Sequence, residues 1–548
     1  MSFVANATRA DRSFARRNAP LPPAGEFELG LVLAGAVAAG AYTAGVLSYV
    51  LDALDAWEDA KNNHPSTVDA PPHRVRIPVV SGASAGALSA ALLARLVDRR
   101  TPQAMAEHPL YSGWVDSADV GDFFSTSDVG RDPIASLLNG QPLEATLTKS
   151  FRAAAQLGER NRTEIFRDLS VILSLTNLEG VAYWSAFRGQ GSRGYGMATH
   201  RDHLRFAVGP AQPPYLNERA LDVSKGPAES NWPLLRTAAL ASGAFPGVFR
   251  AHTLPRPADD YAYRVILQDE KGVALRPLTP HKLPERVETT NVDGGAMNNE
   301  PLELAREVLA GRFKRNPRGG LEAKRAVVLV DPFPEPPAQA TRQAEKPNLV
   351  DVVTKLANGW KQQARFDPSN LELADARDVY SRFLVSPSRS DSTKRHLAGG
   401  FFGGFGGIFS RAFREHDFYL GRLNARVFLE CHLALPEDNP LFDHWSDEQI
   451  AHHASRCRPG HLPVIPLTQA LRDAPKALPS WPRNDVDLDA VERLVRDRFD
   501  AIWEPLLRQA NVGFTGRLWL GPVRRNVRKR LADWMVTTLR DELRDWRP

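Results

Sequence analysis

Two stretches of the chain repeat one order of hydrophobic and polar positions: an apolar run, a short turn of small residues, then a longer segment with helical spacing. The first contains a predicted strand at 27–33 and a helix at 41–56. The second contains a strand at 75–80 and a helix at 87–97. Strand, tight turn and helix in repetition are typical of a parallel sheet covered by helices.

The same pattern continues to about residue 332. Further strands are predicted at 169–175, 181–187, 204–208, 263–267, 289–292 and 326–330, with helices at 234–242 and 301–309. A proline-rich stretch then interrupts the pattern. We therefore predict a flexible N-terminal leader, an α/β domain with a mostly parallel central sheet, a Pro-rich linker and a mainly helical C-terminal region, at 1–25, 26–332, 333–347 and 348–548.

The composition is that of a globular protein. The 548 residues are 43% hydrophobic and 24% charged, and the formal net charge is only +5. That composition excludes a disordered or fibrous chain. The weak charge excess, without a zinc-finger, helix-turn-helix or RNP-like pattern, argues against nucleic acid as a partner.

Two cysteines, Cys431 and Cys457, are separated by 26 positions and form no C-x-x-C pair. A disulfide framework is therefore excluded. We expect two unpaired thiols in a reducing compartment, with a single bridge as the alternative.

The uncharged stretch 29–50 has the length of a membrane span. Its composition argues against one, because four glycines and many alanines gain little on transfer into lipid. The stretch also starts too late and lacks the cleavage site of a signal peptide. We expect it to belong to the α/β domain, with a membrane-spanning protein as the alternative.

One motif carries nucleophile chemistry. Residues 82–86 read Gly-Ala-Ser-Ala-Gly, which matches G-x-S-x-G between an apolar strand and a helix. In this strained turn the serine hydroxyl is exposed at the edge of the sheet, and side chains at Gly82 or Gly86 would clash across the turn. Ser84 is the predicted nucleophile.

A serine hydroxyl needs a base within hydrogen-bond reach. His200, His203, His252 and His281 lie in polar or irregular segments, where surface positions are expected. Asp293, by contrast, ends a predicted strand and is followed by Gly294 and Gly295, which allow close backbone approach. Asp293 is the better candidate, and a Ser-His-Asp hydrolase is the alternative.

With these residues the sequence resembles the patatin-like phospholipases over 26–332. That family pairs the G-x-S-x-G serine with the aspartate of a D-G-G or D-G-A motif. The tail of 293–301 and the block 241–249 also resemble family motifs. The resemblance implies a three-layer domain and a catalytic dyad of Ser84 and Asp293, with no cofactor and no metal.

The family's glycine-rich loop after the first strand aligns with Gly35 to Gly40, but departs from the family pattern. Ala36 and Val37 replace two glycines, and Ala39 replaces a basic residue. We expect β-branched Val37 to disfavour positive φ and so to hinder convergence of the loop amides. The resemblance still implies an oxyanion hole formed by backbone amides of Gly35, Ala36, Val37 and Ala85.

The implied activity is hydrolysis of phospholipid, lysophospholipid or other acyl-ester lipids through an acyl-serine. A non-catalytic lipid-binding or scaffold protein on the same fold is an alternative. The missing targeting signals lead us to expect a cytoplasmic protein, with peripheral contact at the inner face of the membrane.

Four other segments carry weaker signals. Residues 189–194 match G-x-G-x-x-G without a following helix, which indicates a hairpin tip. The pair His452 and His453 lacks ligand partners at metal spacing. The Gly/Phe segment, 399–409, is expected to pack as a loop on the catalytic domain, with lipid contact or lining of an acyl channel as the alternative. At 524–534, basic and apolar residues alternate at helical spacing, which is typical of a solvated helix face or a lipid-surface helix.

Overall fold

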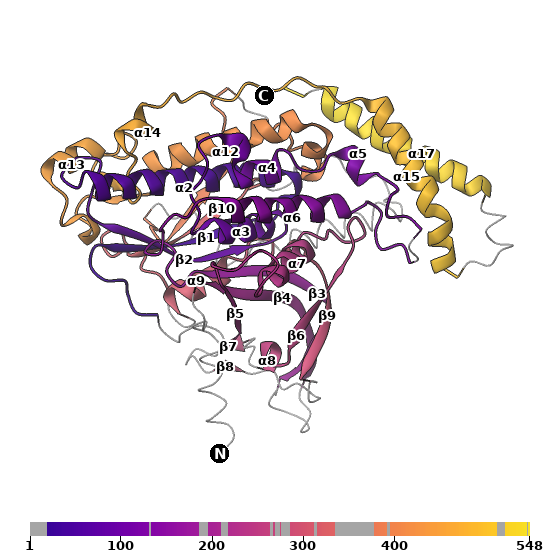
Figure 1. The fold of residues 1–548 in the computed structure, drawn as a ribbon, viewed down its shortest axis with the longest axis horizontal. Coiled ribbons are helices and arrows are strands. Elements are labelled where there is room, and N and C mark those ends of the chain that lie inside the picture. Colours follow the sequence, from indigo (N-terminus) through magenta and orange to yellow (C-terminus); the bar gives the residue numbers. More distant parts are fainter. Residues whose placement is uncertain are drawn as a thin grey trace, which may run out of the picture.

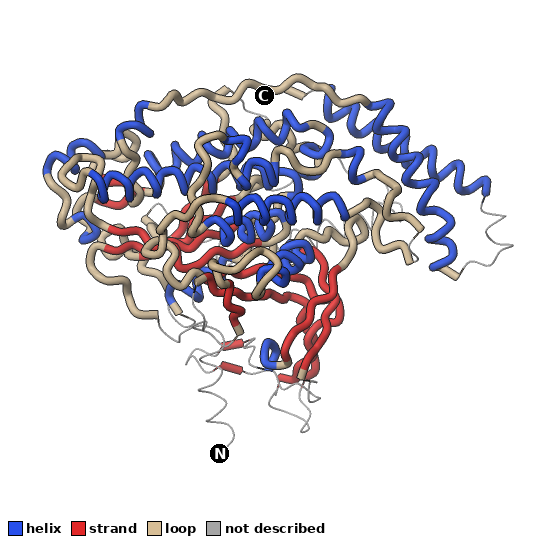
Figure 2. Tube along the Cα trace, in the orientation of Figure 1, coloured by secondary structure: helices blue, strands red, loops and turns tan. Residues whose placement is uncertain are grey.

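The computed structural model describes residues 19–130, 133–185, 195–209, 217–262, 267–268, 274–275, 285–311, 315–334, 378–391, 395–511, 521–544 and 546–547. Within these residues a nine-stranded sheet forms the centre, and helices cover it (Figures 1 and 2). Its strands are β1 (Glu26–Leu33), β2 (Arg74–Gly82), β3 (Ser170–Ser185), β4 (Tyr195–Val208), β5 (Glu218–Leu221), β6 (His252–Pro257), β9 (Arg286–Asp293), β10 (Arg325–Val330) and β11 (Arg382–Val385).

Most strand pairs of this sheet are parallel. The main path runs β11-β10-β1-β2-β3-β4-β5, and β9 pairs with both β3 and β6. The pairs of β3 with β4, β3 with β9 and β6 with β9 are antiparallel. Strand β1 is buried along its whole length, as expected of a strand covered on both faces.

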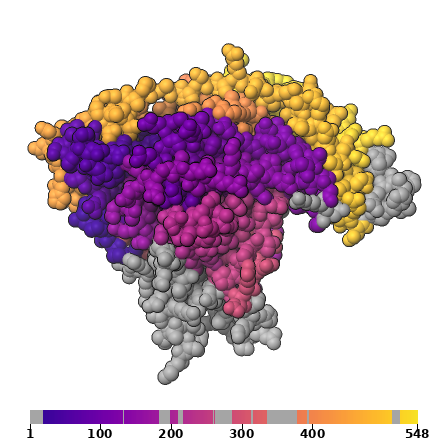
Figure 3. Space-filling model, viewed as in Figure 1, coloured from indigo at the N-terminus to yellow at the C-terminus, as the bar shows by residue number. Residues whose placement is uncertain are grey.

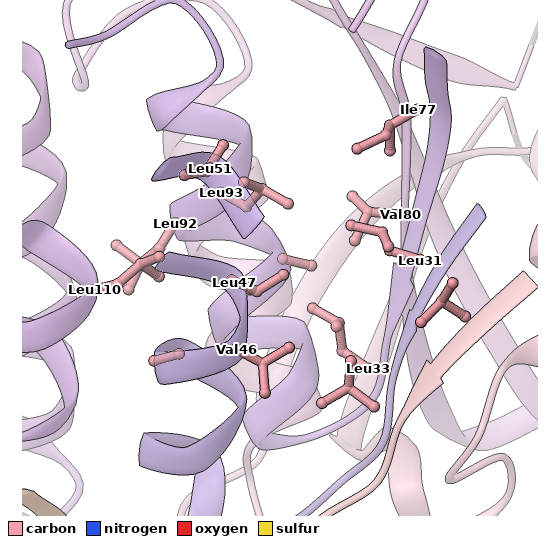
Figure 4. Packing of buried hydrophobic residues seen from close by; sticks show 14 of the residues in the cluster. Leu31, Leu33, Val46, Leu47, Leu51, Ile77, Val80, Leu92, Leu93 and Leu110 are labelled. Atoms are coloured by element: carbon pink, nitrogen blue, oxygen red, sulfur yellow. The ribbon is translucent and has the colours of Figure 1, made fainter. Parts of the chain in front are cut away.

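The two faces of β1 pack against different helices. Leu31 and Leu33 point toward α2 (Gly40–Asn63) and α3 (Ala85–Leu96), as Figure 4 shows. Val32 belongs to a second buried cluster, which includes Ala305 and Leu309 of α9 (Leu302–Ala310). Successive side chains of a strand point to opposite faces, so the sheet lies between two helical layers. The predicted three-layer α/β class is confirmed.

The uncharged stretch 29–50 forms the second part of β1, the loop after it and the first part of α2. By length and composition the helical stretch Val37–Asn63 is long and apolar enough to cross a membrane. However, 83% of its apolar part is buried inside the protein. Burial of this kind is what a core helix of a folded domain shows.

The C-terminal region packs directly on the α/β domain (Figure 3). Helix α12 (Arg411–Cys431) lies along α2, and the two backbones touch at glycines. A Cβ atom on Gly45 would lie 1.9 Å from the Phe418 carbonyl oxygen, and one on Gly421 would lie 2.2 Å from that of Tyr42. Strand β11 also extends the central sheet beside β10. The boundaries at 333–347 remain predictions, but residues on both sides of them share one sheet.

The remaining helices are mostly short. They are α4 (Pro109–Trp114), α5 (Val120–Phe123), α6 (Gln141–Gln156), α7 (Trp232–Ser242), α8 (Asp259–Ala262), α13 (Asp447–His453), α14 (Gln469–Asp473), α15 (Leu488–Gln509) and α17 (Gly521–Arg544). The short pairs β7 (Leu267–Gln268) with β8 (Ala274–Leu275), and β12 (Ala434–Pro436) with β13 (His461–Pro463), stand apart from the main sheet.

The expectation of two unpaired thiols is wrong. Cys431 and Cys457 form a disulfide, with Cα atoms 5.2 Å apart. Cys431 ends α12, and the antiparallel pair β12 and β13 that follows turns the chain back toward it. The spacing of the two cysteines along the sequence does not predict this turn.

The predicted hairpin tip at 189–194 lies in the part of the chain that the structure leaves undescribed. Strands β3 and β4 on either side of it pair antiparallel up to Ser185 and Tyr195. Most of the predicted strand 263–267 and most of the predicted leader also lie outside the described residues.

Candidate active site

Ser84 lies on the turn between β2 and α3. Its φ of 51° and ψ of −123° are rare for a residue with a side chain. Strain of this kind, about 1–3 kcal/mol, persists only where the surroundings enforce it. One such restraint is visible, since the Ser84 amide donates to Ser242 Oγ at 2.9 Å.

The two motif glycines are required by their neighbours. A Cβ atom on Gly86 would lie 2.1 Å from the Leu33 carbonyl oxygen, and one on Gly82 would lie 2.4 Å from that of Gly86. The turn is therefore pressed against the end of β1. This close packing is the steric reason for glycine that the motif predicts.

Asp293 ends β9, where it stands opposite Leu175 of β3. Hydrogen bonds from backbone and side chain hold it: its amide donates to the Ala244 carbonyl at 2.9 Å, its carbonyl accepts from Thr176 Oγ1 at 2.7 Å, and Oδ1 accepts from the Gly295 amide at 2.8 Å. The other carboxylate oxygen, Oδ2, accepts from Ser84 Oγ at 3.4 Å. Folding thus brings together two buried side chains that are 209 positions apart.

No described histidine contacts the Ser84 hydroxyl. His200 Nδ1 bonds to the Asn177 carbonyl oxygen at 2.8 Å, and burial lowers the pKa of half-buried His252 to about 4. His281 lies outside the described residues. The geometry therefore favours a carboxylate over an imidazole as the partner of Ser84.

The loop after β1 keeps a left-handed residue despite its sequence. Val37 has a φ of 50°, contrary to the expectation that a β-branched side chain keeps φ negative here. The amides of Ala36, Val37 and Ala85 donate to no other described residue. The Gly35 amide, by contrast, donates to the Asn299 carbonyl at 3.2 Å, and its role as an oxyanion donor stays a prediction.

The other motif glycines lie in tight packing around these residues. A Cβ atom on Gly35 would lie 2.4 Å from Asn299 Oδ1, and one on Gly295 would lie 2.6 Å from the same oxygen. A Cβ atom on Gly40 would lie 2.1 Å from the Trp114 ring, and one on Gly294 would lie 2.1 Å from the Ser174 carbonyl oxygen. Asn299 therefore touches both the loop after β1 and the aspartate turn.

The C-terminal region supplies the other support for this loop. A Cβ atom on Gly407 would lie 2.9 Å from Ala38 Cβ and 3.3 Å from Arg414 Cγ. Buried Arg414 donates to the carbonyl oxygens of Val115, Gly407 and Ser117, and burial lowers its pKa to about 10. A cation from α12 thus lies beside a loop that lacks its own basic residue.

An apolar cavity opens beside Ser84. Its lining is dominated by Leu, Phe, Trp and Ala side chains, among them Leu88, Leu92, Trp114, Phe123, Leu147 and Phe249. Phe405 and Ile408 of the Gly/Phe segment also line it. Phe401 and Phe409 of the same segment pack in a core cluster. The segment is therefore packed in part and faces the cavity in part, and its contact with lipid or an acyl chain stays a prediction.

His452 and His453 have a partner that their sequence context did not reveal. Potential ligand atoms of Asp69, His452 and His453 lie within 4.8 Å of one another, although Asp69 is remote from the two histidines in sequence. His453 Nε2 bonds to the Val68 carbonyl oxygen at 2.9 Å. None of these three residues lines the cavity beside Ser84.

Sequence reasoning missed the supporting roles of Ser242, Asn299 and Arg414. The first two lie inside quoted motifs, so their positions were a usable signal. Arg414 follows the Gly/Phe segment and belongs to no motif that points to the loop after β1.

Fold and site together define an α/β protein in which a serine on a strand-to-helix turn faces a buried carboxylate above an apolar cavity. The chain belongs to the patatin-like phospholipase family, whose model matches residues 31–306. Family membership supports lipid acyl hydrolysis as the general activity.

Individual proteins that are similar to it include the following two. Uncharacterized protein y4iI of Sinorhizobium fredii is 30% identical over 583 aligned residues, which cover 94% of this chain and 81% of that protein. The crystal structure of VipD from Legionella pneumophila aligns with 95% of this chain and 90% of that one, at 12% identity and a TM-score of 0.21. A score that low supports no argument about fold or function.

Proposed function

We propose that the chain is a serine esterase that releases fatty acids from phospholipids or lysophospholipids through a Ser84–Asp293 dyad. The observation that supports this most is the hydrogen bond from Ser84 Oγ to Asp293 Oδ2 beside an apolar cavity. A serine becomes nucleophilic when a positioned base takes its proton.

The proposed reaction has two steps. Asp293 Oδ2 takes the Ser84 proton while Oγ attacks the ester carbonyl carbon, and the carbon–oxygen bond to the leaving alcohol then breaks as the alcohol receives that proton. Water next attacks the acyl-serine and gives its proton to Asp293. Ser84 regains a proton as the fatty acid leaves.

Charge on the carbonyl oxygen in both steps would be met by the amides of Ala36, Val37 and Ala85. Loss of one such donor typically lowers the rate by about 10²–10³-fold. Because these donors belong to the backbone, the conformation of the loop after β1 sets their position. The positive φ of Val37 is therefore central to the proposal.

The cavity lining supports an acyl chain as the group bound there, since apolar walls with few polar groups suit a hydrocarbon tail. The dyad chemistry requires no cofactor. A cytoplasmic enzyme in peripheral contact with the inner face of the membrane remains part of the proposal.

The test is labelling with a fluorophosphonate probe, together with fatty-acid release from a panel of glycerolipids. Wild type should be labelled and active, whereas Ser84→Ala should lose both properties and Asp293→Asn should lose at least about 10³-fold in rate. Exposed Ser390 and Asp443 provide matched controls as Ser390→Ala and Asp443→Asn. A wild type that binds lipid without labelling would instead identify a non-catalytic lipid-binding protein.

A further inference from the structure

Helix α17 has two apolar faces, and only one of them is packed. Ala532 and Leu539 are buried in a core cluster, and Val536 on the same face is buried as well. The other face, here called the α17 stripe, consists of Val523, Val527, Leu531 and Trp534, which are 43%, 40%, 38% and 57% exposed. Spacings of four, four and three residues place them on one side of the helix.

This stripe is unusual for the molecule. Four of the ten exposed large hydrophobic side chains in the described residues lie in it. Single exposed apolar residues are normal, but a contiguous group of them marks an interaction surface.

The charge around the stripe indicates what that surface would meet. Residues 521–532 contain five basic residues and no acidic ones. Two of them, Arg524 and Arg528, pair with Asp500 of α15. Arg525, Lys529 and Arg530 are exposed and pair with no described carboxylate. By the period of an α-helix, Arg530 lies beside the stripe, whereas Arg525 and Lys529 lie on the opposite side of the helix.

The stripe adjoins the Gly/Phe segment. The Trp534 ring lies 6.0 Å from that of Phe402, and Phe402 in turn lies 6.0 Å from Phe409. Phe405 of the same segment lines the cavity beside Ser84, and the centroid of its ring lies 5.9 Å from that of Phe245. Helices α15 and α17 stand at one end of the molecule (Figure 1), and the stripe side chains are exposed.

We propose that the α17 stripe, with Arg530 beside it, docks on an anionic lipid bilayer, so that lipid reaches the cavity beside the Gly/Phe segment. Apolar residues enter the headgroup boundary while Lys and Arg bind anionic headgroups, as in other interfacial helices. This proposal rests on the proposed function for its substrate, but the docking itself can be tested without catalysis.

The binding test is co-sedimentation with vesicles of phosphatidylcholine alone or mixed with phosphatidylglycerol. Wild type should bind the mixed vesicles and bind neutral ones much more weakly. Leu531→Asp combined with Trp534→Asp should weaken binding at least about tenfold. Arg530→Glu should reduce the preference for anionic vesicles at least roughly fivefold, since each basic residue near such a surface contributes about that factor. Arg525→Glu, on the opposite side of the helix, should change it much less. Leu321→Asp, at a residue that is 56% exposed elsewhere, is the matched control and should bind as wild type does.

Activity separates this proposal from the proposed function. The Leu531/Trp534 variant should hydrolyse a soluble monomeric ester, p-nitrophenyl butyrate, at the wild-type rate while losing activity on mixed vesicles. Ser84→Ala should still bind those vesicles. If wild type binds vesicles but cleaves neither substrate, the proposed function is contradicted and the docking surface is still supported.

Three results would overturn the docking surface. The first is a wild-type protein that does not bind mixed vesicles. The second is a Leu531/Trp534 variant that binds them as wild type does. The third is a wild-type protein that binds neutral and anionic vesicles equally. Gel filtration completes the test: a dimeric wild type that becomes monomeric in the Leu531/Trp534 variant would identify a second copy of the chain as the occupant instead.

Discussion

The turn that carries Ser84 and the loop after β1 lie against each other at one edge of the sheet, yet they are built differently. The turn is determined by five consecutive residues and by contact with the end of β1. The loop is supported by residues remote in sequence: Asn299, and Gly407 and Arg414 of the C-terminal region. A site can therefore combine a motif that is visible in sequence with a part that only the fold completes.

The largest effect is expected when the local turn is broken. Gly86→Ala would place a Cβ atom 2.1 Å from the Leu33 carbonyl oxygen, so the turn must move and take Ser84 out of line with Asp293. We expect ester hydrolysis to fall by about 10³-fold or more. Gly158→Ala is the control, because no atom lies within 4 Å of its Cβ position. Wild-type activity in Gly86→Ala would show that the turn is not rigid.

A smaller effect is expected when the remote support is changed. Gly407→Ala would press on Ala38 Cβ at 2.9 Å and on Arg414. Because a displacement of about 1 Å can cost about 10²-fold in rate, we expect kcat/KM to fall by roughly 10–100-fold with the thermal midpoint little changed. If kcat/KM stays at the wild-type value while the midpoint falls, the C-terminal region stabilises the fold without positioning the loop.

Val37→Gly sharpens the contrast between the two regions. Glycine adopts φ near 50° without the strain of a β-branched residue, and the backbone amides stay in place. We expect the rate to change by no more than about threefold and the free energy of unfolding by no more than about 1 kcal/mol. A tenfold loss of activity, measured beside the unfolding curve, would show that the valine side chain itself is needed.

The expected contribution of His73 concerns stability and leaves the chemistry untouched. His73 directly precedes β2 and contacts the C-terminal region. Its Nε2 bonds to the Val464 carbonyl oxygen, and its Nδ1 accepts a hydrogen bond from Trp445 Nε1 at 3.1 Å. Burial, and to a smaller extent Lys61 and His453, lower its pKa to about 3 although the Val464 bond opposes the shift.

The sign of the pH effect follows from that shift. Between pH 6.5 and 3 the unfolded chain binds a proton at His73 that the folded chain does not. The contribution of His73 to the free energy of unfolding is therefore fully present above pH 6.5 and decreases as the pH falls. At pH 5 the loss from this residue is about 2 kcal/mol. Urea unfolding should show a weaker pH dependence in His73→Gln and an unchanged one in the exposed control His64→Gln. Equal slopes in both variants and wild type would contradict a neutral buried His73.

The layers of the fold and the residues of the turn were predictable because their signals are local. Apolar runs at 27–33 and 75–80, followed by small-residue turns, led to β1, β2 and the helices after them. The family motifs likewise marked Ser84 and Asp293 as a pair, although the contact between them depends on β9 lying beside β3.

What the sequence could not predict depends on distant packing. The Gly35 amide donates to the remote Asn299 carbonyl, and Val37, with its positive φ, lies between Ala36 and Ala38, which are close to Gly404 and Gly407 of the C-terminal region. The disulfide depends on the turn of the chain through β12 and β13. Spacing along the chain carries no information on any of these contacts.

The most direct test of the central claim is peptide mass spectrometry on protein quenched during turnover of an acyl ester. The account predicts an acyl group on the peptide that contains Ser84, and a decrease of that adduct as the ester is exhausted. Fatty-acid release with no adduct on that peptide, or with the acyl group on another residue, would contradict it.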